Sequence, residues 1–371
     1  MKRVVTRVVV AGLGDTGLLT AIHLAQHRDL EVVGISSQPG LVSGQELGTR
    51  LARPDDWQRD YRIAFERYRA LDRVRVRHAE VTGLDLAART VRLRDAERHD
   101  SEEPYDVLVI ATGVRNGFWR TPDLRTADEV TADLATAHAR LADSATVLVV
   151  GGGAASVGSA LQLALRWPDK RISLAFPGER GLPQHHLRTW THAARRLEAA
   201  GVELLAGRRA VVPDDAEAIT SGPVSWQTAH QPTKADAVLW AIGRTQPNTA
   251  WLPQELLDEH GFVRVTPTLQ LPTSSGVFAI GDVAATDPLR ASARSRADKL
   301  LARNIRAHLA GRSLQTYRAP RHRWGSVLGV EPDGLRVFAP DGRPYRFPRW
   351  TVDTLLQRWI VRRGIYRGVR D

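Results

Sequence analysis

The hydrophobic pattern contains two stretches in which an apolar run enters a glycine-rich turn and then a helix-like segment. The first, VVVAGLGDTG at Val8–Gly17, continues as LLTAIHLAQ, and the second, ATVLVVGGGAAS at Ala145–Ser156, continues as VGSALQLALRW. Short apolar runs closed by glycine indicate buried strands, and apolar residues three and four apart indicate a helix face. The pattern predicts a strand–turn–helix unit at each stretch, with a strand at Val4–Ala11 and a helix at Gly17–His27 in the first.

Three further apolar runs end in small residues: YDVLVIATG at Tyr105–Gly113, AVLWAIG at Ala237–Gly243 and VFAIGD at Val277–Asp282. Strands that alternate with helical segments favour a parallel sheet covered by helices. We therefore expect an α/β protein with two Rossmann-like dinucleotide-binding domains and a small C-terminal α+β segment. The predicted boundaries are residues 1–118 with 244–310 for the first domain, 119–243 for the second and 311–371 for the C-terminal segment.

The glycines of such a turn have separate roles. Gly12 allows the sharp turn, Gly14 leaves room for a pyrophosphate beside the main chain, and Gly17 permits close packing of helix on strand. The helix N-terminus adds free N–H groups and a positive dipole end. The second turn, Gly151–Gly153 followed by Ser156, repeats the pattern with serine as its third small residue, so two dinucleotide sites are predicted.

Composition narrows the chemistry. The 371 residues contain no cysteine, which removes disulfides, thiolate metal sites and a redox-active C-x-x-C pair. No run approaches the roughly 20 apolar residues of a membrane span, and we expect a cytoplasmic protein. The net charge of +11 comes from 48 arginines and four lysines spread along the chain. This scatter favours a coding bias over a basic binding surface, so no nucleic-acid partner is predicted.

The paired glycine turns, the A-T-G and A-I-G strand ends and the late A-I-G-D together resemble the flavoprotein reductases with two dinucleotide domains. The stretch GFVRVTPTLQLPTSSGVFAIGDVA looks most like type II NADH dehydrogenases and the ferroptosis-suppressor and apoptosis-inducing-factor-like quinone reductases. The resemblance implies FAD in the first turn and NADH or NADPH in the second. The cofactor-binding residues that it implies are Gly12, Gly14, Asp15, Thr16, Gly17, Ser36, Ser37, Arg50, Val81, Ala111, Thr112, Gly113, Gly281 and Asp282 for FAD, and Gly151, Gly152, Gly153, Ala154, Ala155, Ser156 and Gly243 for the nicotinamide side.

The chain departs from the family pattern at both sites. In the family, an acidic residue normally ends the second strand and bonds the adenosine ribose. The corresponding position in this chain is Ser36 or Ser37, so the acid is missing. Gly158 stands where the family commonly has a glutamate beside the nicotinamide ribose. The strand after the second turn ends in Phe176 with Arg180 nearby, and without an acid there NADPH and NADH both remain open as donors.

The acceptor is the least determined part of the prediction. No catalytic side chain is expected, because the cofactors carry the redox chemistry. The helix-like segment Asp287–Ala310 lacks the alanine–glutamine motif and the lysine of the two related groups, so a quinone-like acceptor follows from the resemblance alone. Arg290 and Arg294 share a face and contact either an anionic acceptor or solvent. The adjacent His185 and His186 are predicted to be surface residues, with no metal site.

The tail combines two predicted hairpin turns, Asp333–Gly334 and Asp341–Gly342, with a basic amphipathic segment at Trp350–Arg370. Its apolar stripe includes Trp359 and Ile360 and lies opposite arginines. Tryptophan on a basic amphipathic helix is typical of membrane-surface anchors. Peripheral contact with the inner face of the membrane, a cover over the pocket and a homodimer contact all remain open.

The leading hypothesis is an FAD-dependent enzyme that passes hydride from NAD(P)H through the flavin to a quinone-like or other small-molecule acceptor. One alternative is a diverged flavoprotein that acts on a specialised small molecule with weakened or lost NAD(P)H use. A third hypothesis is a flavoprotein scaffold or nucleic-acid binder, which the scattered arginines do not favour.

Overall fold

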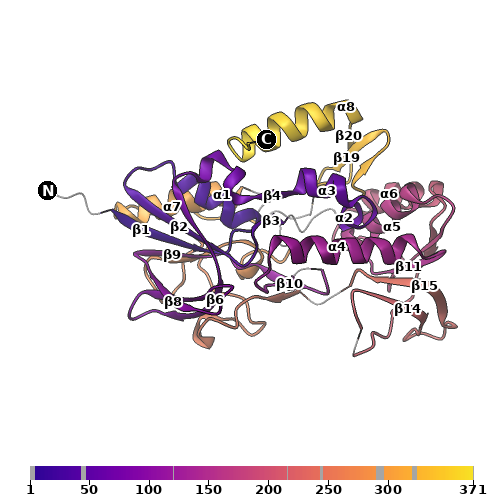
Figure 1. Cartoon of the computed structure of the whole chain (residues 1–371), viewed down its shortest axis with the longest axis horizontal. Coiled ribbons are helices and arrows are strands. Elements are labelled where there is room, and N and C mark those ends of the chain that lie inside the picture. Colours follow the sequence, from indigo (N-terminus) through magenta and orange to yellow (C-terminus); the bar gives the residue numbers. More distant parts are fainter. Residues whose placement is uncertain are drawn as a thin grey trace.

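The computed structural model describes residues 5–42, 47–119, 121–214, 216–242, 245–289, 296–319 and 324–370. Its two main sheets lie side by side along the long axis of the molecule, and a C-terminal arm, yellow in Figure 1, extends along one side of both. The predicted α/β class is confirmed.

The first sheet is parallel and has the strand order β17-β9-β1-β2-β5. One face is covered by α1 (Asp15–Leu24) and α7 (Ala297–Leu309), whose apolar residues join those of β1 and β2 in one core. The other face is covered by a three-stranded antiparallel sheet. The strands of the parallel sheet are β1 (Thr6–Ala11), β2 (Leu30–Ser36), β5 (Val74–His78), β9 (Val107–Ile110) and β17 (Val277–Ala279), and those of the antiparallel sheet are β6 (Glu80–Asp85), β7 (Thr90–Arg94) and β8 (Asp100–Pro104).

The second sheet has the order β13-β12-β11-β15-β14, with β14 antiparallel to the other four strands. Its helices contribute apolar residues to a separate core. Two independent sheets with similar strand–turn–helix starts agree with the two units predicted. The elements are α4 (Ala127–Ala142), β11 (Thr146–Val150), α5 (Ala154–Arg166), β12 (Arg171–Ala175), α6 (Leu187–Ala199), β13 (Glu203–Leu205), β14 (Ile219–Val224) and β15 (Thr233–Trp240).

The two halves are joined by paired segments and by helix packing. The crossover strands β10 (Val114–Asn116) and β16 (Thr245–Pro247) pair antiparallel. The short helix α2 (Leu47–Ala52) packs closely on α5, where a Cβ on Gly48 would lie 2.5 Å from the carbonyl oxygen of Gly158. Smaller elements complete this region: β3 (Gly40–Val42), α3 (Pro54–Tyr61), β4 (Arg62–Ala64), the 3-10 turns η1 (Phe65–Arg67) and η2 (Arg69–Leu71), and, further along the chain, η3 (Gln254–Leu256) and η4 (Gly281–Val283).

The C-terminal segment forms a small antiparallel sheet and a helical arm, as predicted. The sheet consists of β18 (Val330–Glu331), β19 (Gly334–Phe338) and β20 (Pro344–Phe347). Its first turn is at Pro332–Asp333, one residue before the predicted position, because Gly334 already pairs with Glu331 in β19. The arm is α8 (Arg349–Thr351) continued by η5 (Val352–Ile365), which has wide π-type turns. Within the described residues, no helix has the length and apolar character needed to cross a membrane.

Several predicted boundaries were wrong. The first helix is Asp15–Leu24, because the turn glycine Gly14 is its N-cap. The alternating apolar and polar residues of Val74–Leu93 predict a β-meander with a turn at Thr82–Gly83. In the structure Thr82–Gly83 is a bulge within β6, and Val74–His78 joins the parallel sheet, so the antiparallel meander begins at Glu80. In place of a helix from Asp287, helix α7 begins at Ala297 after a left-handed Arg296.

Candidate functional site

A cavity of about 1070 Å³ lies between the two halves and is bordered by both glycine turns. Since the turns follow the carboxyl ends of β1 and β11, the cavity occupies the place where ligands bind in open α/β sheets. The predicted residues that line it are Gly12, Gly14, Asp15, Thr16, Ser36, Ser37, Arg50, Val81, Ala111, Thr112, Gly113, Gly151, Gly152, Gly153, Ala154, Ala155 and Asp282.

The first glycine turn has the geometry of a phosphate cradle. Gly12 has φ +103°, and a Cβ there would overlap the carbonyl oxygen of Ala111. A Cβ on Gly17 would overlap the carbonyl oxygen of Gly12, whereas a Cβ on Gly14 would meet nothing within 4 Å. Gly14 is the N-cap of α1, with no side-chain cap. Open space beside uncapped helix N–H groups fits the pyrophosphate of a dinucleotide.

The second turn repeats this arrangement with one change. Gly151 has φ +144° and abuts the carbonyl oxygen of Ala241, while Gly153 is the uncapped N-cap of α5 and faces open space. Ser156 replaces the third glycine, and its buried hydroxyl donates a 2.8 Å hydrogen bond to the carbonyl oxygen of Gly153. The second turn therefore also fits a pyrophosphate, with its serine bonded inside the turn.

Residues that follow strands β17 and β9 support the first glycine turn. Gly281, with φ +85°, packs against the hydroxyl of Thr16, and Asp282 follows it at the cavity wall. At the end of β9 the hydroxyl of Thr112 donates to the carbonyl oxygen of Asn248 at 2.8 Å. The Asn248 amide donates back to the carbonyl oxygen of Thr112 at 2.9 Å. These bonds fix the strand ends that the family resemblance assigns to FAD.

Arg50 lies in the cavity wall between two tryptophans. Its guanidinium carbon is 5.1 Å from the ring centroid of Trp57 and 6.0 Å from that of Trp119, and one of its N–H groups donates to the carbonyl oxygen of Trp119 at 3.4 Å. Burial lowers the pKa of Arg50 to about 10, and the neighbouring charge of Arg125 acts in the same direction. Its Nε has no hydrogen-bond partner among the residues that the structure describes. A buried cation in a cavity wall fits an anionic ligand.

Ser36, Ser37 and Val81, which the resemblance assigns to the adenosine end of FAD, line the same cavity. Ser36 is buried, and its hydroxyl oxygen accepts the N–H of Gln38 at 3.1 Å. Arg125, which the sequence reading missed, also lines this cavity, and its backbone N–H donates to the carbonyl oxygen of Ser37 at 2.9 Å. An arginine 88 residues further along the chain carries no local sequence signal.

The C-terminal segment also forms part of the wall, and this contribution was missed. Ser326, Val327 and Gly329 line the cavity next to Gly158. A Cβ on Gly158 would lie 3.1 Å from the carbonyl oxygen of Val327. The backbone of the C-terminal segment therefore approaches the point where the family commonly carries a glutamate side chain.

The prediction that the adjacent His185 and His186 both lie on the surface was only partly correct. His186 is the N-cap of α6, and its ring nitrogen accepts the N–H of Arg188 at 3.2 Å. His185 is 7% exposed and lines the cavity, so its assignment to the surface was wrong. The loop after β12 carries it inward, because the N–H of Leu182 donates to the carbonyl oxygen of Gly152 at 2.7 Å.

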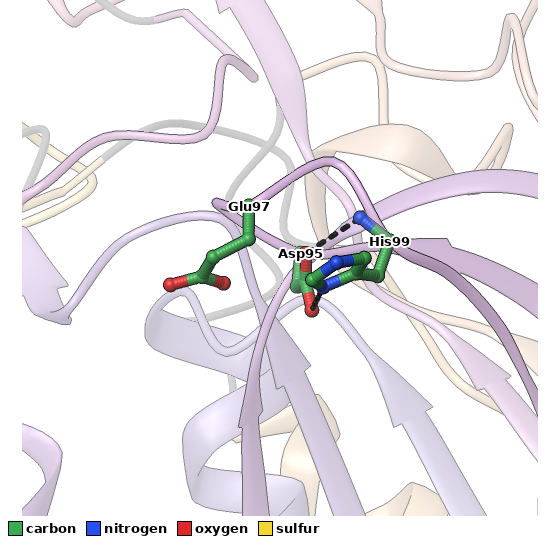
Figure 2. Close-up of side chains that lie close together, drawn as sticks. All are labelled: Asp95, Glu97 and His99. Atoms are coloured by element: carbon green, nitrogen blue, oxygen red, sulfur yellow. Dashed lines mark hydrogen bonds and ion pairs between the residues drawn. The ribbon is translucent and has the colours of Figure 1, made fainter.

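A second cluster of ionisable groups, Asp95, Glu97 and His99, lies on the turn between β7 and β8 and is shown in Figure 2. The carboxylate of Asp95 accepts the backbone N–H of His99 at 2.8 Å and lies 3.4 Å from its ring. None of the three lines the described cavity. Gly243, Arg290 and Arg294, named from the sequence, lie outside the described residues.

Residues 6–304 match the family model described as pyridine nucleotide-disulphide oxidoreductase. The chain belongs to this family. Membership confirms the predicted resemblance and the two-dinucleotide fold. It also supports the assignment of an FAD-dependent oxidoreductase that uses NAD(P)H.

Curated relatives agree with this assignment. The chain is 26% identical to the demethylphylloquinone reductase NdbB of Synechocystis over 96% of both chains. It is 28% identical to the type II NADH:quinone oxidoreductase Ndh of Mycobacterium tuberculosis, over 82% of this chain and 73% of that protein. Its similarity to oxidoreductase OXR1 of Ajellomyces capsulatus, 26% identical, covers 58% of this chain and 49% of OXR1, so the chain spans about half of that relative.

Solved structures show the same fold. An engineered water-forming NADPH oxidase bound to NADPH superposes with a TM-score of 0.66 at 18% identity, covering 89% of this chain and 74% of the other. At this identity the likeness concerns the fold alone.

Proposed function

We propose that this protein passes hydride from NAD(P)H to FAD and delivers the electrons to a quinone-like or other small-molecule acceptor. The observation that carries the proposal is a single cavity bordered by two uncapped helix N-termini, each preceded by an open glycine turn. Two phosphate cradles in one cavity suit two dinucleotides whose reactive rings meet between them.

Within this proposal, residues 1–118 and 244–310 hold FAD, and residues 119–243 hold the nicotinamide dinucleotide. When bound, the flavin supplies the two-electron chemistry. The chain's own groups bind and orient: the turn from Gly12 to Gly17 cradles the FAD pyrophosphate, and Arg50 neutralises its charge. Asp282 accepts hydrogen bonds from the flavin side, and Gly151–Gly153 cradle the second pyrophosphate.

The acceptor assignment draws on the names of the relatives, two of which are quinone reductases. In this chain the Ser326–Gly329 segment closes the cavity beside α2 and α5. We place the acceptor subsite at this wall, because it borders the cavity that both glycine turns also line.

A spectral titration tests the proposal. The purified protein, loaded with FAD, is mixed anaerobically with NADPH or NADH while the visible absorbance of the oxidised flavin is recorded. Bleaching, followed by recovery on addition of menadione, is the expected result. A protein that takes up no flavin contradicts the whole proposal, and recovery with oxygen but not menadione contradicts the quinone acceptor.

A second candidate is a diverged flavoprotein with weak NAD(P)H use. The close approach of Val327 to Gly158 favours it, because backbone occupies the place of the family glutamate. The same titration separates the two candidates: retained FAD with no bleaching by either nucleotide supports the diverged flavoprotein.

We further propose that the C-terminal arm contacts a membrane surface. Trp350, Leu355, Trp359 and Ile360 are 72%, 50%, 53% and 44% exposed. The arm is held to the rest of the protein by Arg362, which donates to the carbonyl oxygen of Arg59 at 3.0 Å. No residue of the arm lines the cavity in the described part of the chain, so the pocket-cover alternative lacks support.

Co-sedimentation with vesicles containing anionic lipid tests this contact. Binding that is lost in a Trp350→Ser, Trp359→Ser double variant is the expected result, because exposed tryptophans and flanking arginines suit an anionic interface. A salt-insensitive dimer of the unchanged protein, lost in the same variant without vesicle binding, instead assigns the face to a homodimer contact.

A further inference from the structure

The adenosine end of the first cradle lacks the acid that normally bonds the ribose, and the crossover segment Thr121–Arg125 lies over this position. The backbone N–H of Arg125 donates to the carbonyl oxygen of Ser37 at 2.9 Å. The side-chain amide of Gln38 donates to the carbonyl oxygen of Asp123 at 3.0 Å. A strap from the interdomain crossover is thus tied to the two residues that follow β2.

The strap makes a third contact, with β5, the strand that neighbours β2 in the sheet. The ring Nε2 of His78, the last residue of β5, lies 3.1 Å from the carbonyl oxygen of Arg125. Thr121, Pro122 and Arg125 line the cavity together with Ser36 and Ser37. The strap is therefore part of the wall at the adenosine end and is held from two neighbouring strands.

The strap also brings a second cation to this part of the wall. Arg125 and Arg50 both line the cavity, and they lie close enough for the charge of Arg125 to lower the pKa of Arg50. The guanidinium of Arg125 is paired with Asp133, whose side chain is 65% exposed, whereas that of Arg125 is 22% exposed. The carboxylates among the described residues that line the cavity are Asp15, Glu80 and Asp282, and Glu80 lies beside Val81. Two guanidinium groups on one wall favour a ligand with more than one negative charge.

We propose that Arg125, carried by the Thr121–Arg125 strap, is a binding residue for the adenosine diphosphate part of FAD and donates its N–H groups to phosphate or ribose oxygens there, in place of the hydrogen-bond acceptor that the missing acid would supply. This inference rests on the proposed function, because it assigns FAD to the first cradle. It differs from that function in naming a residue outside both glycine turns. It also ties flavin binding to the segment that connects the two domains.

Equilibrium dialysis of FAD against the full-length chain tests the inference. Arg125→Met removes the charge and keeps the length of the side chain, and we expect about 10- to 100-fold weaker FAD binding, as for loss of a charge-assisted hydrogen bond. Arg140→Met is the matched control, because Arg140 lies on α4, pairs with the exposed Glu217 and does not line the cavity. Equal FAD affinity in the wild type and Arg125→Met overturns the inference.

Two further measurements locate the effect. ADP competes for the adenosine end, so its affinity falls by the same factor as that of FAD in Arg125→Met, while FMN affinity stays unchanged. Tighter binding of 2′,5′-ADP than of ADP to the wild type, abolished in Arg125→Met, would assign the arginine to a 2′-phosphate and overturn the flavin role.

A second variant distinguishes weaker FAD binding from loss of folding. Gln38→Ala cuts one tie of the strap without changing charge, and we expect several-fold weaker FAD binding with an unchanged circular dichroism spectrum. Unchanged FAD binding in Gln38→Ala refutes the role of the strap. A wild-type chain that binds no FAD at all instead refutes the proposed function, so the two failures are distinguishable.

Discussion

The two glycine turns use the same backbone geometry but fill the third position differently. In the first, Gly17 packs directly on the carbonyl oxygen of Gly12, so no side chain fits. In the second, Ser156 occupies the equivalent place and bonds to Gly153. The difference shows that the third position limits how closely helix and strand approach. In the proposed function, the open second position leaves space for the pyrophosphate. Two buried or half-buried arginines, Arg50 and Arg125, also line the cavity that the two turns share.

The largest effect is expected from Gly17→Ala. The added Cβ overlaps the Gly12 carbonyl oxygen, so strand and helix must separate, at a cost of at least about 3 kcal/mol of unfolding free energy. The matched change in the second turn, Ser156→Ala, removes only a hydroxyl bond and should cost about 1 kcal/mol. Chemical denaturation of both variants measures the contrast. Equal losses would show that the turns are built alike.

The next effect separates the ligands. Gly14→Val and Gly153→Val each add a side chain where nothing lies within 4 Å of a Cβ, so the fold is retained and the pyrophosphate space is filled. We expect at least about tenfold weaker FAD binding in Gly14→Val with NAD(P)H binding unchanged, and the reverse in Gly153→Val. Calorimetric titration of each nucleotide checks this. Loss of FAD in Gly153→Val would reverse the assignment of the cradles.

A smaller effect is expected for Arg50→Met, which should raise the stability of the flavin-free protein but weaken its binding of FAD. Burial lowers the pKa of Arg50 to about 10, so between that pH and the ordinary arginine range the folded protein binds fewer protons than the unfolded chain. The buried charge therefore costs stability at neutral pH, and the flavin-free protein gains stability as the pH rises above about 10. In Arg50→Met we expect a melting temperature a few degrees higher without FAD, and weaker FAD binding.

Thermal melts of Arg50→Met without and with FAD measure both the gain in stability of the flavin-free protein and the loss of FAD binding. Arg59→Met serves as control, because Arg59 is an exposed arginine of α3 that pairs with Asp56 and Asp60 and does not line the cavity. A flavin-free Arg50→Met protein that is less stable than the wild type would mean that Arg50 stabilises the fold and is not held for a ligand.

Local sequence patterns were enough to locate the two glycine turns and the order of the elements around them. An apolar run, a glycine turn and a helical stripe are local patterns, since each depends on residues within one strand–turn–helix unit. Gly12, Gly14 and Gly151–Gly153 therefore lie where their spacing placed them, and the strand ends at Ala111 and Asp282 meet the same cavity. The ends of elements were predicted less well, because they depend on packing against neighbouring segments. Helix α7, for example, begins at Ala297 and not at the predicted Asp287.

The tertiary structure alone decided which distant segments complete the cavity. The strap at Thr121–Arg125 and the wall at Ser326–Gly329 reach it through backbone hydrogen bonds and glycine contacts with other parts of the chain. Neither segment carries a motif. His185 likewise turned inward because the loop after β12 bonds to the Gly152 carbonyl through Leu182. Backbone contacts of this kind are almost independent of side-chain identity, so they leave no pattern in the sequence to read.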